Sequence, residues 1–254
     1  MGLADLHTHT SFTDGMMDVR QLMDHAQEHT ALDVLAVTDH DDLQAGYVAR
    51  DLAVRHPYRF EVIVGCEITT LQGHVLALFI EEPIARLQSI EHTLEAIHKQ
   101  GGLAIAPHPL SWLTFSVGES TLRRIAAGAR AGVYFDGIET GNPTVAAKVR
   151  HQRVLQLNAE LLHLPEIGAS DAHFLPAVAA GVTAFAGSTA AELREAIAAK
   201  TTVASAPGVS LREIGYGNLV RQQVQSLVVA PSRSVGREVR KAIDRVRASG
   251  SGAA

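Results

Sequence analysis

Short runs rich in Val, Ile and Leu alternate along the chain with longer amphipathic stretches. Apolar runs of this length are typical of strands that are buried on both faces, as in β/α units. The predicted strands cover residues 3–7, 34–38, 61–66, 74–79, 103–106, 137–139 and 166–169, with 182–185 as a further candidate. The pattern therefore predicts an α/β barrel or a wound sheet.

The amphipathic stretches between these strands predict helices, several of which begin at an Asp, Ser or Thr that can cap the first turn. The predicted helices cover residues 18–28, 43–54, 84–99, 120–127, 144–163 and 189–200, followed by 211–229 and 234–248. We expect residues 1–205 to form the barrel and residues 206–248 to form helices that pack on it. Residues 249–254 contain only Gly, Ser and Ala and should form a flexible tail.

The composition is that of one globular domain, because 254 residues with 46% hydrophobic content can bury a core of barrel size. A net charge of -5 provides no large positive field to hold nucleic acid or a membrane surface.

The single cysteine, Cys66, cannot form an internal disulfide and suits a reducing cytoplasm. The sequence shows neither a secretory leader nor an apolar stretch of about 18 residues. We therefore expect a soluble, cytoplasmic protein that binds no membrane.

Histidines and acidic residues collect at the ends of the predicted strands. His7 and His9 follow the first strand, and alternate residues of an extended chain point to one side, so both imidazoles can reach one cation. The other candidates at strand ends or in adjoining loops are Asp14, His40, Glu67, His74, His108, Asp171 and His173. Because the carboxyl ends of parallel barrel strands share one face, these side chains should meet at one mouth.

The candidate set comprises six imidazoles and three carboxylates. A mononuclear catalytic centre uses only about three or four ligands, so this set predicts a centre with more than one divalent ion. Mixed nitrogen and oxygen donors favour zinc, manganese or iron over calcium and magnesium. Elemental analysis of the purified protein would distinguish these metals.

Taken in order, the motifs resemble the polymerase and histidinol phosphatase (PHP) family. The motifs are His-x-His, a loop Asp, Thr-Asp-His, Gly-x-Glu, His, Pro-His-Pro and Asp-x-His, within residues 5–173. Gly181-Val182-Thr183, which follows them, is also similar to the family. The resemblance implies a distorted (β/α)7 TIM-like barrel that hydrolyses phosphate esters with two or three metal ions.

The resemblance also implies how the ligands divide among the metals. One metal would be bound by His7, His9, Glu67 and Asp171, a second by His74 and His108 with Glu67 bridging, and a third by Asp14, His40 and His173. Every ligand position of the family pattern is occupied in this chain, which favours an active enzyme over a degenerate module.

These residues predict a phosphoesterase for a small phosphomonoester, such as a nucleotide or histidinol phosphate. Water shared between two cations loses a proton near neutral pH, and the resulting hydroxide would attack phosphorus, so we assign no side-chain nucleophile.

Asn142 is a candidate substrate contact or a turn residue, and Asp39 or Asp41 either orients an imidazole or caps a helix. Trp112 and Phe115 could wall the site, stack on a base or imidazole, or pack within their loop.

Two other functions are compatible with a barrel and a His-x-His motif. A nuclease or proofreading module related to this family would act on nucleic acid and would need a basic groove, which the composition does not indicate. An amidohydrolase-type C–N hydrolase would need a bridging lysine at the end of a middle strand, where this chain has Glu67. The sequence leaves the oligomeric state open.

The ligand assignment predicts that His9→Ala and Asp171→Ala each abolish turnover, because each removes a donor to the central metals. Circular dichroism should show that both variants keep the wild-type fold. Full activity in either variant would contradict the assignment.

Overall fold

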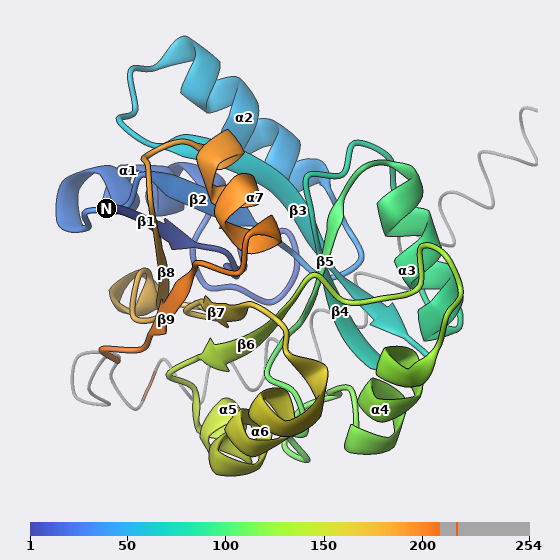
Figure 1. The fold of residues 1–254 in the computed structure, drawn as a ribbon. Helices are drawn as coiled ribbons and strands as arrows, with labels where there is room; N and C mark the ends of the chain where they lie inside the picture. The colour runs from blue at the N-terminus through green and yellow to red at the C-terminus, as the bar shows by residue number, and fades with distance from the viewer. Residues whose placement is uncertain (209–216, 218–254) are drawn as a thin grey trace, which may run out of the picture.

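A curved mixed sheet forms the centre of the molecule, and helices surround it (Figure 1). This computed structural model describes residues 1–208 and 217, so the predicted helices at 211–229 and 234–248 and the tail at 249–254 lie outside the described residues. The strands are β1 (Gly2–Asp5), β2 (Val34–Val37), β3 (Glu61–Thr70), β4 (Gly73–Leu78), β5 (Leu103–Ala106), β6 (Gly137–Gly141), β7 (Glu166–Gly168), β8 (Val182–Phe185) and β9 (Val203–Ser205). Their order in the sheet is β7-β6-β5-β4-β3-β2-β1-β8-β9.

Two strands of this sheet, β4 and β8, run opposite to the others. Strands β1, β2 and β3 are parallel to one another, as are β5, β6 and β7. Strand β4 runs antiparallel to both of its neighbours, and β8 runs antiparallel to β1 and β9. Because β4 is reversed, it begins at the end of the barrel where its neighbours β3 and β5 finish. Its second residue, His74, therefore lies at that end.

The two halves of the sheet approach one another at β7 and β8, which makes the barrel nearly closed. The Thr183 hydroxyl donates to the Gly168 carbonyl at 2.7 Å and accepts from the Gly168 amide at 3.0 Å. A Cβ on Gly168 would lie 2.0 Å from the Val182 carbonyl oxygen, so only glycine permits this approach. The Thr202 hydroxyl adds a bond of 2.9 Å to the Glu166 carbonyl.

Helix α7 (Ala190–Ala198) covers the end of the barrel at which the parallel strands begin. The amide of Ala190 bonds the Glu61 carboxylate at the start of β3, and Arg194 bonds the Gly101 carbonyl just before β5. Leu193 and Ile197 are buried in the same apolar cluster as side chains of the barrel strands. The opposite end, where these strands finish, is therefore the end left for a site.

The other helices are α1 (Val19–His29), α2 (Gln44–Arg55), α3 (Ile90–Lys99), α4 (Glu119–Ala127), α5 (Val145–Lys148) and α6 (His151–Leu157). Capping explains where several begin: Asp18 accepts from the Gln21 amide in a capping box, and Thr189 does the same for α7. None of the helices in residues 1–208 combines the length and apolarity needed to span a membrane.

The α/β barrel is confirmed, and every predicted strand is present. The resemblance implied seven strands, whereas the described residues form nine, because β4, β8 and β9 extend the parallel set. Strand β9 was missed, since its three residues are partly exposed and carry no apolar run.

Two helix predictions were wrong in extent. The helix predicted from residue 84 begins at Ile90, because the Ser89 side chain caps it. The helix predicted over 144–163 is divided into α5, α6 and a π-helical turn over Asn158–Leu162.

We predict that Gly168→Ala destabilises the protein by about 2–3 kcal/mol, because the new methyl group would overlap the Val182 backbone and force the barrel seam apart. Denaturant unfolding would measure this loss. Gly118→Ala is the matched control, since a Cβ there meets nothing within 4 Å, and it should change stability by no more than about 0.5 kcal/mol. Equal effects of the two substitutions would contradict the role of Gly168.

Candidate metal centre

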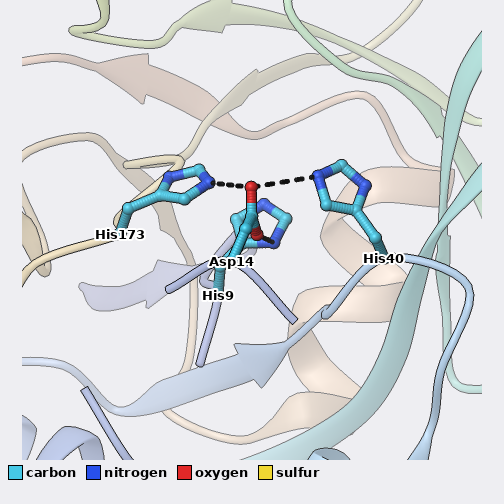
Figure 2. Close-up of side chains that lie close together, drawn as sticks. All are labelled: His9, Asp14, His40 and His173. Carbon is cyan, nitrogen blue, oxygen red and sulfur yellow. Dashed lines mark hydrogen bonds and ion pairs between the residues drawn. The ribbon is translucent and has the colours of Figure 1, made fainter. Parts of the chain in front are cut away.

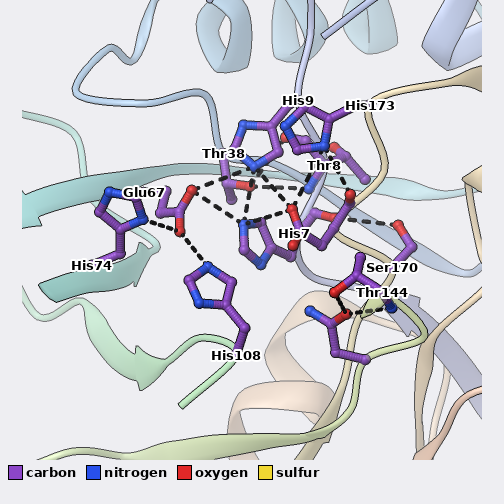
Figure 3. A network of polar contacts seen from close by, with 12 residues as sticks. His7, Thr8, His9, Thr38, Glu67, His74, His108, Thr144, Ser170 and His173 are labelled. Atoms are coloured by element: carbon purple, nitrogen blue, oxygen red, sulfur yellow. Dashed lines mark hydrogen bonds and ion pairs between the residues drawn. The ribbon is translucent and has the colours of Figure 1, made fainter. Parts of the chain in front are cut away.

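Backbone pairing continues past the ends of the strands and carries the candidate ligands into the barrel mouth. Parallel bridges join Thr8 to Ala172 and His40 to Glu67. The Thr8 amide donates to the Thr38 hydroxyl at 3.0 Å, and the Thr8 hydroxyl donates to the Ala36 carbonyl at 2.6 Å. These contacts hold the chain around His7 and His9 in a rigid extended form (Figure 3).

Asp5 ties the first strand to the loop that carries Asp171. Its carboxylate accepts from the amides of Ser170 and Ala179, each at 2.9 Å, across more than 160 residues of sequence. Complete burial raises the pKa of Asp5 to about 6 even though these bonds favour the charged form. The carboxylate thus fixes the relative position of two ligand-bearing segments.

Glu67 lies at the centre of the site, with imidazoles around both of its oxygens (Figure 3). Oε1 is 2.9 Å from His74 Nδ1 and 2.9 Å from His108 Nε2. Oε2 is 3.1 Å from His40 Nδ1 and 3.4 Å from the Nε2 atoms of His7 and His9. Burial acts to raise the pKa of Glu67, but the neighbouring imidazoles, His74 first, hold it well below its usual range.

Asp14 is the centre of a second group, which Figure 2 shows. Its Oδ2 lies 3.1 Å from His173 Nε2 and 3.7 Å from His40 Nε2, and its Oδ1 lies 3.6 Å from His9 Nδ1. The rings of His9 and His173 stack with centroids 4.3 Å apart. Burial acts to lower the pKa of His173, but the Asp14 carboxylate raises it to about 9.

Asp171 bridges the two groups. Its Oδ1 lies 3.7 Å from His7 Nε2, 3.5 Å from His9 Nε2 and 3.7 Å from His173 Nδ1. Asp171 has a φ of 53° and His108 a φ of 29°, in the left-handed region that side chains rarely adopt. Backbone strain of this kind is found at functional sites, where the surrounding structure holds it in place.

The donors form four overlapping groups in which one atom from each residue lies within 4.8 Å of the others. The groups are His9, Asp14, His40 and His173; His7, His108 and Asp171; His7, His9 and Glu67; and His40, Glu67 and His74. Within the described residues, the buried atoms His9 Nδ1 and His74 Nδ1 complete no hydrogen bond, although Asp14 Oδ1 lies 3.6 Å from the first and Glu67 Oε1 2.9 Å from the second. Buried nitrogen without a completed hydrogen bond is costly unless it binds something, so this donor set fits divalent metal ions.

All nine predicted ligands therefore converge, and the donor groups overlap, so their division among separate ions stays a prediction. His9 lies with Asp14, His40 and His173 as well as with His7 and Glu67, and Asp171 groups with His7 and His108. The number and identity of the ions stay a prediction.

Glu139, which the sequence analysis did not include, orients the central imidazole. Its Oε1 accepts from His7 Nδ1 at 2.7 Å, while Oε2 accepts from the His108 amide at 2.7 Å and the Asn142 side-chain amide at 2.9 Å. This leaves His7 Nε2 facing the other donors, the arrangement in which a carboxylate fixes the tautomer of a metal-binding histidine. The sequence did offer one signal for Glu139: it ends a predicted strand, as the candidate ligands do.

The remaining candidates hold loops in place. Asn142 donates to Glu139 and accepts from the amide and hydroxyl of Thr144, and its contact with substrate stays a prediction. Asp39 accepts from the amide and hydroxyl of Thr10 and from the Thr13 hydroxyl, so it shapes the loop before Asp14.

Asp41 accepts from the Thr69 amide at 2.7 Å. Neither Asp39 nor Asp41 is hydrogen-bonded to an imidazole of the described residues, and Glu139 has that role instead.

The fold and the site define a class, the α/β barrels with a cluster of histidine and carboxylate donors at the mouth. The PHP domain family matches residues 5–101, and the PHP-associated family matches residues 151–202. An uncharacterized protein of Methanocaldococcus jannaschii is 35% identical over 127 residues, which cover 46% of this chain and 72% of that protein. The chain belongs to the PHP family.

Solved structures share the fold at low sequence identity. A two-domain Bacteroides vulgatus protein containing a predicted PHP-like metal-dependent phosphoesterase has a TM-score of 0.63 and 21% identity, over 80% of this chain and 64% of that chain. Endonuclease Q, in complex with a duplex bearing an abasic lesion, has a TM-score of 0.53 and 15% identity, over 78% of this chain and 56% of that chain. An amidohydrolase from Chromobacterium violaceum has a TM-score of 0.51 and 17% identity, over 67% of this chain and 87% of that chain. The chain thus spans less than two thirds of the first two proteins.

We predict that Glu139→Gln weakens metal binding by about 10- to 100-fold, because an amide cannot accept from His7 and from both donors at Oε2 without turning its own N–H toward one of them. Competition with a chromophoric chelator would measure the affinity. Glu166→Gln, on the neighbouring strand, is the matched control, since Glu166 contacts the Thr140 hydroxyl and should leave affinity unchanged. Wild-type affinity in Glu139→Gln would rule out this role.

Proposed function

We propose that this protein is a metal-dependent phosphoesterase that hydrolyses a small phosphomonoester, such as a nucleotide or a compound like histidinol phosphate. The observation that carries the proposal is the convergence of nine imidazole and carboxylate side chains at one end of the barrel, two of which, Glu67 and Asp14, are buried carboxylates with imidazoles around them. The likeness of the fold to a PHP-like metal-dependent phosphoesterase supports it.

The nine side chains would hold two or three ions, with Glu67 between two of them. Divalent ions lower the pKa of water to near neutrality and neutralise phosphoryl oxygens, which supplies both a nucleophile and stabilisation of developing charge. The chain contributes position: Glu139 fixes the ring of His7, and the Asp171 carbonyl lies 2.9 Å from His173 Nδ1 and orients that ring.

The imidazoles also make metal binding depend on pH. The pKa values of His7, His108 and His173 are raised by neighbouring carboxylates against the opposing effect of burial. A proton on one of these rings competes with an ion for the same nitrogen, so ions should bind more weakly as the pH falls.

Charge around the mouth supports a small substrate over a polymer. The loops that carry the ligands, residues 8–17, 39–43, 68–72, 107–118 and 169–181, contain no lysine or arginine. Nucleic-acid binding depends on cations that contact several phosphates along the backbone. With such cations missing from these loops, bound ions would supply most of the affinity for a phosphoryl group.

A nuclease is the second candidate, and the fold shared with Endonuclease Q, solved with a lesion-containing duplex, favours it. Arg150 and Arg153 line a pocket together with Ser111, which follows His108 in the chain, and they are cations that a nucleic acid could contact beside the site. A C–N hydrolase ranks below both, because no lysine ends a middle strand, where amidohydrolases need a bridging one, and Glu67 offers a bridging carboxylate instead.

We predict turnover of p-nitrophenyl phosphate and of at least one of histidinol phosphate or a nucleoside monophosphate when manganese or zinc is added, and loss of turnover with a chelator. Single-stranded DNA should be cleaved far more slowly in the same assay. Cleavage of DNA alone would favour the nuclease, and hydrolysis of none of these esters by metal-loaded protein would refute the phosphoesterase.

A further inference from the structure

The loop that joins β5 to α4, residues 107–118, carries one of the nine ligands, His108, and its side chains contact both that ligand and a second one, His74. It leaves the barrel at His108 and returns at Gly118, the residue that precedes α4. Its base is closed by a bond of 3.1 Å from the Leu110 amide to the Val117 carbonyl. We refer to this segment as the β5–α4 loop.

The loop rests on the turn that follows Glu67. Gly73, at the start of β4, has a φ of 131°, and a Cβ there would lie 2.5 Å from the backbone of both Ser116 and Val117. The His74 amide donates to the Phe115 carbonyl at 2.8 Å. The loop and the beginning of β4 are therefore joined through backbone contacts that leave no space for a side chain.

Ser116 acts on one ligand, His108. Its hydroxyl oxygen is 2.7 Å from His108 Nδ1, while the opposite ring nitrogen, Nε2, is 2.9 Å from Glu67 Oε1. A hydroxyl that accepts the Nδ1 proton leaves the Nε2 lone pair for an ion. The Thr114 hydroxyl lies 2.8 Å from the Ser116 hydroxyl and 3.3 Å from His108 Nδ1, so it can accept in place of Ser116.

Phe115 acts on the other ligand, His74. The two rings meet edge to face, with centroids 5.6 Å apart and an interplanar angle of 85°. The Phe115 side chain is 49% exposed, so burial in the core does not account for its position. On its other sides the His74 ring faces Glu67 Oε1 and the rings of His40 and His108, which are metal-ligand candidates themselves, so Phe115 is the ring contact from outside the ligand set.

The His74 and His108 rings contact the same carboxylate oxygen of the site. His74 Nδ1 and His108 Nε2 are each 2.9 Å from one oxygen, Glu67 Oε1, although the histidines come from separate strands. An ion beside this oxygen needs both nitrogens directed at it. A single loop that touches both rings can hold them in that arrangement.

We propose that Ser116 and Phe115 are positioning residues, which direct His108 and His74 at one metal ion beside Glu67 Oε1. The proposal rests on the metal-dependent function proposed above, but it concerns the affinity of one ion and not the reaction. Removing the contacts lowers the affinity for that ion, while the ions bound through Asp14 and Asp171 are retained.

The test is a titration of the metal-free full-length protein with zinc and with manganese, in competition with a chromophoric chelator. Ser116→Ala combined with Thr114→Val lowers the affinity of one ion by about 10- to 100-fold and leaves the others within about threefold, because both acceptors for His108 Nδ1 are lost. Ser116→Ala alone has a smaller effect, since Thr114 substitutes, and Ser116→Thr keeps the wild-type affinity. Phe115→Leu lowers the same affinity by about three- to tenfold.

Two further measurements separate positioning from general damage. Leu113→Ala removes a half-exposed apolar side chain from the same loop and leaves every ion bound as in wild type. Nitrogen-15 NMR of zinc-loaded protein reports the His108 tautomer, which is a single Nδ1–H form in wild type and in Ser116→Thr, and a mixture in the double variant.

Wild-type affinity for every ion in the double variant overturns the proposal, as does an equal loss in Leu113→Ala. If wild-type protein binds ions and hydrolyses no phosphate ester, the proposed function fails, while the titration still decides the role of Ser116 and Phe115.

Discussion

The structure depends on the burial of one carboxylate, Glu67, which is 1% exposed. A buried charge is tolerated only where opposite charge or strong hydrogen-bond donors surround it, and here five imidazoles do so. Those rings would turn away without support of their own, and a second layer of contacts supplies it. Glu139 holds His7, and Ser116 holds His108. Mutation of this outer layer should therefore affect the ions nearly as much as mutation of the ligands themselves.

Sheet topology delivers these rings to one place. A fully parallel barrel would bring only strand ends to the mouth, whereas the reversed β4 adds a residue from a strand beginning, His74, next to Glu67 on the paired strand. Closure at Gly168 and Thr183 then brings the Asp171 loop against the first strand, where Asp5 ties it down. Helix α7 covers the opposite end of the barrel. Chemistry is thus confined to the end where the parallel strands finish.

The charge of the barrel mouth suggests that bound ions and loop side chains would contact different parts of a substrate. Its ligand-bearing loops are rich in acids and histidines and contain no lysine or arginine, so phosphate affinity in the proposed enzyme comes chiefly from the ions. Two of the side chains exposed on the β5–α4 loop, Trp112 and Phe115, are aromatic and can contact an organic leaving group. Affinity from ions and selectivity from loops would allow relatives with the same barrel to act on different esters.

The sequence alone determined the strands apart from β9, the barrel class and the identity of all nine converging side chains. Burial on both faces produces apolar runs that are visible locally, and the ligands follow those runs directly. Tertiary structure decided what depends on curvature and closure. The pairing of His7 with Glu139 spans 132 residues, and the group of His9 with Asp14, His40 and His173 combines residues from three distant parts of the sequence. The loop-fixing role of Asp39 and the division of the predicted helix at 144–163 were hidden for the same reason, since contacts between distant segments leave no periodic signal in the chain.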